Sequence, residues 1–291
     1  MADDPPRPPV AGVIGVAMKW VALRPDVDPV AGTVSCDDRF AGASPADRAA
    51  LEWALRLAEL RGSTVTVATV GPAAADALLR DALAAGADRA VRVDPGLGDG
   101  RQPPSRAVAA ALAEALHGCE LVLCGDWSLD RGSASVPAFL AADLDVAQAC
   151  GLVALVPDPV GTVIVAERRL DGGYRQHLRI TGPAVLSVEG SVARLRRATL
   201  AGVLGASRAT VEVLSRPMAQ HETGVRSVRT TAFRPPARVL MGPDPADSAR
   251  SRVEQLTGSM TERTPPQTLV LHPEAAADRI IEQLRSWGEL E

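Results

Sequence analysis

The residues best suited to bind a ligand lie in the segment 119–140, CELVLCGDWSLDRGSASVPAFL. Its apolar run, Leu121–Leu123, predicts a buried parallel strand that Gly125 ends, and Pro137 opens a helix start. A turn between a strand and a helix can bind phosphate, because free N–H groups and the helix dipole face the anion. A turn that only caps its helix is the competing interpretation, since neither GxGxxG nor GxxxxGK[ST] is present.

Three charged residues could add chemistry to this turn. Asp126 and Asp130 are four positions apart and could bind a metal ion or a ribose, although capping and loop hydrogen bonds use aspartates in the same way. Lys19 follows the apolar run Val13–Met18, at the carboxyl end of a predicted strand, where ligands bind in open α/β sheets. The alternative is a lysine that simply leaves the strand toward solvent.

Groups for bond-making catalysis are not arranged in a known pattern. The histidines at positions 117, 177, 221 and 272 show neither an HExxH motif nor another paired spacing. No GxSxG elbow is present to support a Ser-His-Asp hydrolase. The sequence therefore indicates a binding protein and not an enzyme.

The elements that would position these residues follow an α/β order. Ser44 is a predicted N-cap, Pro45 suits the first helical position, and Asp47 completes a capping-box pattern for a helix that ends at Gly62. Further strands and helices alternate along the first half of the chain, and a right-handed, doubly wound parallel sheet of the Rossmann-like type is the expected fold. They are expected at Val65–Val70, Ala73–Ala85, Arg89–Val93 and Ser105–His117.

The pattern changes after residue 150. Strands are predicted without intervening helices, joined by a hairpin at Asp171–Gly173, and so an antiparallel extension is expected. The predicted strands are Leu152–Val156, Thr162–Arg168, Gln176–Ile180, Pro183–Val188 and Val211–Leu214. The segment Arg194–Leu200 combines arginines with an apolar stub, which is either a solvated cationic loop or a docking element.

The two ends of the chain differ from this domain. Residues 1–10 are rich in proline and charge and are predicted to be a disordered tail. Residues 11–214 form the expected nucleotide-binding domain, and 215–291 form a polar, proline-rich arm. Helices are expected in this arm over Ala246–Leu256 and, with one apolar face, over Pro273–Trp287.

Composition excludes several other classes. The 291 residues are 46% hydrophobic and carry a net charge of −4, so no basic footprint for nucleic acid or an anionic membrane exists. No apolar run is long enough to span a bilayer. The four cysteines contain no CxxC pair and no secretory segment precedes them, which predicts free thiols in the cytoplasm.

The segment 165–188 combines a small residue, a basic residue, an acidic-Gly hairpin, a Gln, and a Pro before apolar residues. These are Ala166, Arg168, Asp171-Gly172-Gly173, Gln176, Leu178 and Pro183-Ala184-Val185-Leu186. In this pattern the segment resembles the β subunit of electron transfer flavoprotein, with Ser187 departing from the usual Thr, Ala or Cys. Matches extend over roughly 13–214, and the divergence and high Ala and Arg content resemble the branch encoded with mycofactocin systems in actinobacteria.

The resemblance implies an electron-carrying heterodimer. The family's α subunit holds the redox FAD, and its β subunit holds a structural AMP or, in bifurcating members, a second FAD. A flavin-dependent dehydrogenase and an electron-accepting oxidoreductase are the implied partners. Carried over by position, the nucleotide would touch Ala17, Met18, Lys19, Ser44, Pro45, Ala46, Asp47, Val70, Gly125, Asp126, Trp127, Ser128, Asp130, Arg131, Gly132 and Ser133. The turn is shorter than the family's D-x-D-x-x-Q-x-G and lacks its Gln.

The same resemblance favours the docking interpretation of the arginine-rich segment. Arg196, Arg197, Ala198, Thr199 and Leu200 match the family's partner-recognition loop, with Leu200 at its anchoring leucine and Arg197 where an aromatic is common. The arm 215–291 is then expected to contact the α subunit. The alternative is a stand-alone nucleotide-binding protein of the universal-stress type, which explains the first strands but not the Asp171 hairpin.

Overall fold

The computed structural model describes residues 12–28, 31, 33–97, 103–218, 242–257, 268–288 and 290. The chain divides into two compact units, Met1–Phe233 and Arg234–Glu291. The tail expected at 1–10 lies outside the described residues, as do 219–241 and 258–267 of the expected arm. The boundary expected between residues 214 and 215 therefore stays a prediction.

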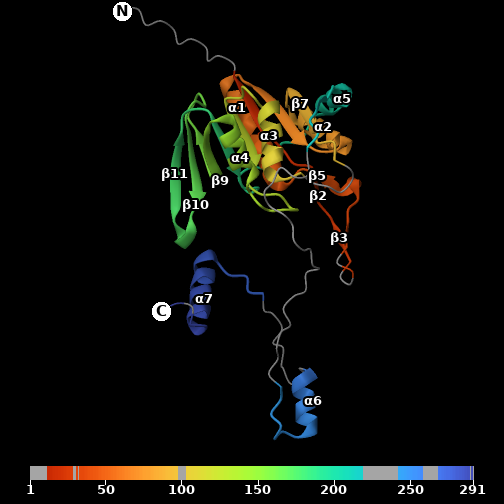
Figure 1. The fold of residues 1–291 in the computed structure, drawn as a ribbon. Helices are drawn as coiled ribbons and strands as arrows, with labels where there is room; N and C mark the ends of the chain where they lie inside the picture. The colour runs from red at the N-terminus through yellow and green to blue at the C-terminus, as the bar shows by residue number, and fades with distance from the viewer. Residues whose placement is uncertain are drawn as a thin grey trace, which may run out of the picture. The chain divides into compact units, whose positions relative to one another are not determined.

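The first unit is built on one large sheet (Figure 1). Within the described residues nine strands form it, in the order β11-β10-β9-β12-β8-β1-β6-β7-β13. They are β1 (Val13–Ala17), β6 (Thr64–Val70), β7 (Arg89–Asp94), β8 (Leu121–Gly125), β9 (Ala147–Pro157), β10 (Ile164–Arg169), β11 (Arg175–Ile180), β12 (Ala184–Val188) and β13 (Glu212–Ser215). The strands from β9 through β12 to β13 pair in parallel, and β9, β10 and β11 pair antiparallel. The expected Rossmann-like fold with an antiparallel extension is confirmed.

Helices cover both faces of this sheet. They are α1 (Pro45–Arg61), α2 (Asp76–Ala85), α3 (Ser105–Ala115) and α4 (Val136–Leu144). The cluster that includes Leu51 and Leu79 joins α1 and α2 to one face, and the cluster that includes Leu112 and Leu140 joins α3 and α4 to the other. The chain moves outward from β1 to β6 and β7, and then crosses to β8 on the other side of β1. Because the crossovers are right-handed, α1 and α2, which lead outward to β6 and β7, lie on one face of the sheet, and α3 and α4, which follow the crossing back, lie on the other.

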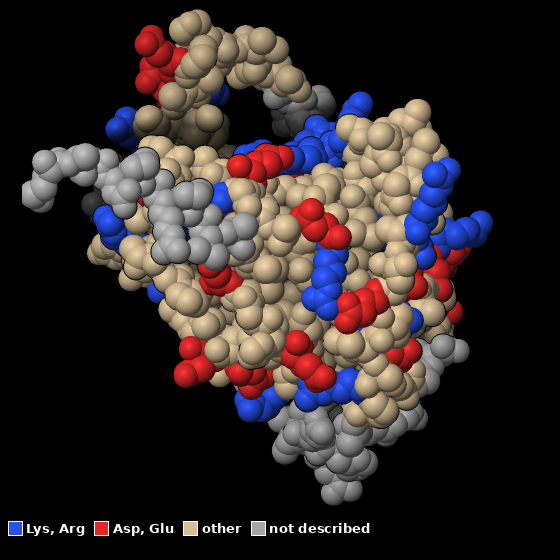
Figure 2. All heavy atoms as spheres, turned by 90° about the horizontal axis from the view of Figure 1, so that it is seen from above, with Lys and Arg blue, Asp and Glu red and all other residues tan. Residues whose placement is uncertain are grey.

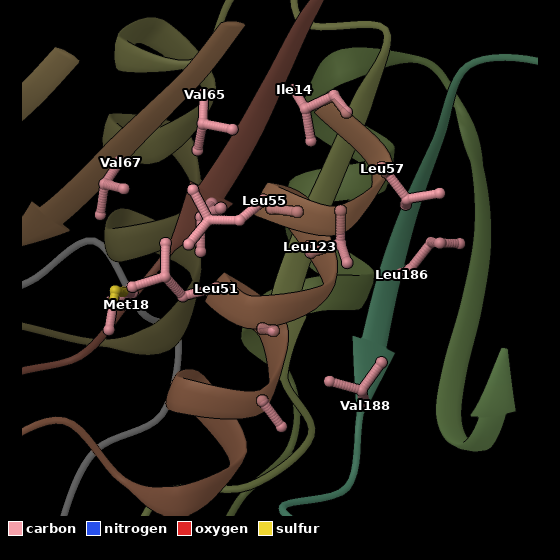
Figure 3. Close-up of a cluster of buried hydrophobic side chains, with 14 of the residues drawn as sticks. Ile14, Met18, Leu51, Leu55, Leu57, Val65, Val67, Leu123, Leu186 and Val188 are labelled. Atoms are coloured by element: carbon pink, nitrogen blue, oxygen red, sulfur yellow. The ribbon is translucent and has the colours of Figure 1, made fainter. Parts of the chain in front are cut away.

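The sequence signals around α1 act as expected. The Oγ of Ser44 accepts a hydrogen bond of 3.1 Å from the backbone N–H of Asp47, and Pro45 takes the first helical position. Gly62 ends the helix with a φ of +67°, which a residue with a Cβ adopts only with strain. Leu51, Leu55 and Leu57 then point between α1 and the sheet (Figure 3).

The antiparallel extension differs from its prediction at one end. β9 begins at Ala147, five residues before the expected start, because its first half pairs in parallel with β12 and its second half pairs antiparallel with β10. Gly151 lies where the pairing changes, with a φ of +71°, and its N–H donates to the Oγ of Ser187 at 2.9 Å. The Asp171–Gly173 hairpin joins β10 to β11 as predicted.

Two small pairs of strands fill the connection between β1 and α1. β2 (Val21–Ala22) pairs with β5 (Ala41–Gly42), and β3 (Asp26–Val27) pairs with β4 (Val34–Ser35). Both pairs are antiparallel.

A helix that the sequence did not predict follows the arginine-rich segment. α5 spans Leu200–Arg208, so it begins at the last residue of that segment and continues where no element was expected, and Thr199 caps it by accepting the N–H of Gly202 at 3.0 Å. The helix packs on α2, and a Cβ on Gly202 would lie 2.5 Å from the backbone oxygen of Ala84. This close approach explains why a glycine stands at position 202, although glycine destabilises the interior of a helix.

The second unit contains both helices expected in the arm. They are α6 (Ala249–Thr257) and α7 (Pro273–Ser286). Ile280, Ile281 and Trp287 of the α7 region are exposed, so the apolar face of α7 has no cover from the described residues of its unit.

Candidate functional site

The candidate site lies where the carboxyl ends of β1 and β8 meet the start of α1. These two strands are neighbours, with Ala17 opposite Cys124, while β6 pairs with the other edge of β1. The chain runs outward in opposite directions from this point, and ligands bind at such switch points in open α/β sheets. The topology thus brings together residues that are far apart in the sequence.

Asp47 is the central polar group of the site. Its side chain is buried, and its carboxylate accepts the backbone N–H of Lys19 at 3.2 Å and that of Gly125 at 3.3 Å. One carboxylate therefore joins the ends of β1 and β8 to the first turn of α1. Burial raises the pKa of Asp47 to about 6, although hydrogen bonds from Lys19, Ser44 and Gly125 oppose the rise.

Gly125 is required by this arrangement. A Cβ at this position would lie 2.6 Å from the Oδ1 of Asp47 and 2.9 Å from its backbone nitrogen. A side chain here would separate β8 from the helix start. Gly190 makes a similar approach, since its Cβ would lie 2.9 Å from the Cβ of Pro45.

The turn after β8 is attached to β1 by an ion pair. The Nζ of Lys19 lies 2.7 Å from the Oδ1 of Asp130, and the two side chains are 35% and 23% exposed. Within the turn, the N–H of Gly132 donates to the Oγ of Ser128 at 3.3 Å, and the hydroxyls of Ser133 and Ser135 are 3.0 Å apart. The Nζ of Lys19 therefore lies beside the turn.

The other turn residues hold the turn to its surroundings. The N–H of Asp126 donates to the backbone oxygen of Val188 at 3.0 Å, and Arg131 donates to the backbone oxygen of Pro103 at 2.9 Å. Trp127 is exposed. Burial, followed by the charge of Glu189, raises the pKa of Asp126. Among the described residues, no three His, Cys, Asp or Glu side chains gather in a way that could hold a metal ion.

The remaining predicted site residues lie at the margin. Met18 points into the apolar cluster under α1 (Figure 3). Ala17 is buried on the opposite face of β1, and Val70 is half-buried at the end of β6, one strand farther from the turn. The structure therefore brings together Lys19, the helix start 44–47, Gly125 and Asp130, and leaves Met18 in the core.

Two buried polar groups near the sheet edge carried no sequence signal. Arg92 on β7 is buried and pairs with Asp76 at 2.7 Å and with Asp94 at 3.2 Å. The hydroxyl of Thr69, beside it on β6, is buried and has no hydrogen-bond partner among the described residues. Threonine is common in strands, and Arg92 shares its face of β7 with Asp94, so neither residue stands out in the alternation of its strand.

The cysteines are free thiols, as expected. Cys124 is buried beside the site, and burial raises the pKa of its thiol, with the nearby charges of Asp47 and Cys150 adding to the effect. A thiol in such surroundings is a poor nucleophile. Cys124 therefore contributes packing.

The predicted docking segment, residues 196–200, is attached to α1 at one end and exposed at the other. Arg196 donates to Glu52 and Glu59 of α1, so its side chain is used within the chain. Arg197, Ala198 and Thr199 are exposed, and Leu200 is 76% exposed at the start of α5. Glu52 and Glu59, seven residues apart on α1, are partners that sequence reasoning missed.

Comparison with known proteins identifies the family. The family model described as electron transfer flavoprotein domain matches residues 36–219. The chain belongs to the electron transfer flavoprotein family. Its matched region contains the helix start, Gly125, the turn and the docking segment.

Several relatives support this assignment. The electron transfer flavoprotein subunit beta of Mycobacterium tuberculosis (strain ATCC 25618 / H37Rv) is 34% identical over 212 residues, which cover 70% of this chain and 77% of that one. Protein FixA of Azorhizobium caulinodans is 32% identical over 195 residues, 65% of this chain and 69% of the relative. The beta subunit of Thermoanaerobacterium thermosaccharolyticum is 29% identical over 190 residues, 65% of this chain and 72% of the relative. The chain is thus an electron transfer flavoprotein subunit similar to the beta and FixA type.

Surface properties complete the description. On the face in Figure 2, acidic and basic side chains are interspersed. None of the helices in the described part of the chain combines the length and apolar character needed to cross a bilayer.

Proposed function

We propose that this chain is the β subunit of a heterodimeric electron transfer flavoprotein. It carries electrons, with an α subunit, from a flavin-dependent dehydrogenase to a downstream oxidoreductase, and performs no bond chemistry itself. The observation that carries the proposal is the family match over 36–219, which spans the parts of the site on α1 and β8 and the docking segment. The redox FAD belongs mainly to the α subunit in this assignment.

The site suits a structural AMP bound on the side of the turn. A phosphate needs a cation and hydrogen-bond donors, and Lys19, Ser128 and Ser133 offer them together with N–H groups of the turn. Asp47 is itself an anion at the start of α1 and accepts the N–H groups of Lys19 and Gly125. Ser44–Asp47 would therefore shape the site, while the turn 126–133 would hold the phosphate.

The chemistry of the released nucleotide tests this assignment. We expect mass spectrometry of the denatured complex to find AMP from this chain and FAD from the α subunit. The isolated chain should lack yellow colour and should show a flavin spectrum only with its partner. A flavin bound tightly to the isolated chain would instead favour the bifurcating type with a second FAD.

Leu200 is the proposed contact with the dehydrogenase. This residue is 76% exposed, and a large apolar side chain in that state suits a partner pocket. Leu200→Ala should slow electron transfer from the dehydrogenase and leave the FAD content unchanged. Equal transfer rates in the variant and the wild type would remove the docking assignment.

The α subunit is the proposed partner of the second unit. The exposed Ile280, Ile281 and Trp287 leave an apolar surface that a partner could cover. A stand-alone protein of the universal-stress type is the alternative, and gel filtration with and without the α subunit separates the two. A stable homodimer that does not bind the α subunit would favour the alternative. The free thiols support a cytoplasmic location, and the association with mycofactocin systems stays a prediction.

A further inference from the structure

Arg196 forms charged hydrogen bonds between the segment that joins β12 to α5 and the helix α1. The backbone N–H and the Nε of Arg196 each donate to the Oε2 of Glu52 at 3.0 Å, and its Nη2 lies 3.3 Å from the Oε1 of the same carboxylate. The guanidinium also donates to both carboxylate oxygens of Glu59. One residue thus connects the segment to two carboxylates that lie about two turns apart on the helix.

This contact is partly removed from solvent. The side chain of Glu52 is 5% exposed, and Arg56 on the same helix face donates to its Oε1 at 2.8 Å. Burial would raise the pKa of Glu52, but the hydrogen bonds from Arg196 and Arg56 outweigh burial and lower it. Hydrogen bonds to Glu59 and Glu52 raise the pKa of Arg196 in turn. Such a charged contact is stronger than an ion pair on the open surface.

The anchored arginine lies four positions before Leu200. Leu195 packs partly against the core beneath α1, and Thr199 caps α5. At the far end of α5, Arg80 of α2 donates to the backbone oxygens of Ala206 and Ala209 at 3.2 and 3.1 Å. The segment is therefore held on both sides of Leu200, whose own side chain stays exposed.

We propose that Arg196 positions the docking segment and does not itself contact the dehydrogenase. By holding residues 195–199 against α1 through Glu52 and Glu59, it fixes the direction in which Leu200 points. This inference rests on the proposed docking function of Leu200. A preordered segment loses less conformational entropy when the partner binds.

Arginine suits this role better than lysine. Its planar fork reaches two carboxylates at once, whereas the ammonium of a lysine is a point charge that cannot reproduce both contacts. The Arg196→Lys variant should consequently keep only part of the wild-type attachment of the segment to α1. A residue that touched the dehydrogenase through charge alone would be replaced by lysine with little loss.

The test uses the complete heterodimer and the flavin-dependent dehydrogenase that reduces the wild-type complex. Arg196→Gln should raise the KM of the dehydrogenase for the heterodimer about tenfold, the order expected for a residue that matters at an interface. The kcat and the FAD content should stay unchanged. Hydrogen exchange of residues 193–199 should become about tenfold faster, because without the guanidinium contacts the segment opens more often and the backbone N–H at position 196 is released from Glu52 more often.

Two variants serve as matched controls. Arg194→Gln removes the same charge from an exposed position two residues away. Arg56→Gln removes a cation from Glu52 without touching the segment. Neither should change the KM or the exchange of 193–199 by more than about twofold. Glu59 is 62% exposed, so Glu59→Gln should fold normally. This variant should raise the KM and speed the exchange of 193–199, as Arg196→Gln does, but to a smaller extent.

The outcomes separate the inference from the function on which it rests. A raised KM with unchanged exchange would mean that Arg196 contacts the dehydrogenase directly, and would overturn the inference. Unchanged KM and unchanged exchange would also overturn it. If Leu200→Ala leaves electron transfer unaffected while Arg196→Gln still speeds exchange, the docking function fails but the anchoring of the segment stands.

Discussion

Replacement of the buried Asp47 by Asn should reveal the energetic cost of its charge. The pKa of this carboxyl rises from 3.8 to about 6 in the folded chain, chiefly through burial. As pH increases, the unfolded chain ionises first, so the folded state loses stability until the pH exceeds about 6. One pKa unit corresponds to about 1.36 kcal/mol, which gives about 3 kcal/mol in all and about 2 kcal/mol between pH 4.5 and 7.5.

Asn carries no charge and therefore lacks this pH dependence. It keeps one oxygen acceptor, and its amide nitrogen would face the N–H of either Lys19 or Gly125, which costs about 1–3 kcal/mol for the unpaired group. The variant should thus be clearly less stable than the wild type at pH 4.5. At pH 7.5 the two should be nearly equal, since the penalty of the buried charge offsets the lost hydrogen bond.

The assay is urea unfolding of the chain, followed by far-UV circular dichroism from pH 4.5 to 7.5. The quantity that matters is the difference in unfolding free energy between the two proteins, in which contributions from all other titrating groups cancel. Asp145→Asn is the matched control, because Asp145 is exposed and its φ of +55° is one that Asn tolerates. A difference for Asp47→Asn that varies by less than about 0.5 kcal/mol over this range would refute the reasoning.

Two further predictions concern the neighbours of Asp47. Gly125→Ala should destabilise the chain by about 1–3 kcal/mol, because its Cβ would lie 2.6 Å from the Oδ1 of Asp47; an unchanged melting temperature would show that β8 and α1 can separate without cost. Toward a thiol reagent, the exposed Cys36 should react quickly in the folded chain, whereas Cys124 should react only after unfolding; rapid reaction of Cys124 would mean that the strand opens often.

Local signals predicted most of the fold. Ser44, Pro45 and Gly62 define α1 through caps and backbone conformation that depend on residues within a few positions. The apolar runs of β1, β6 and β8 read as buried strands because both faces of the sheet are covered. These features are visible in a sequence because the interactions that create them are local or follow a regular period.

The features that the sequence did not predict depend on distant contacts. α5 contains Gly202 and Gly205, which disfavour a helix, and it is held by α2 through the close approach at Ala84 and the hydrogen bonds of Arg80. Arg196 was predicted as a docking residue from its position, but its partner Glu52 is 144 residues away in the chain. No periodicity or short motif reports such a pair.

Asp47 explains why a nucleotide-type fold can form here without a glycine-rich phosphate motif. In a phosphate loop, backbone N–H groups at the sheet edge stay available for the ligand. In this chain the carboxylate of Asp47 accepts the N–H groups of Lys19 and Gly125, and so these two groups are hydrogen-bonded without a ligand. The side chain of Lys19, paired with Asp130, then remains as the cation that faces the turn. A phosphate that binds there would compete with Asp130 for Lys19, whereas the contacts of Asp47 would persist in both states.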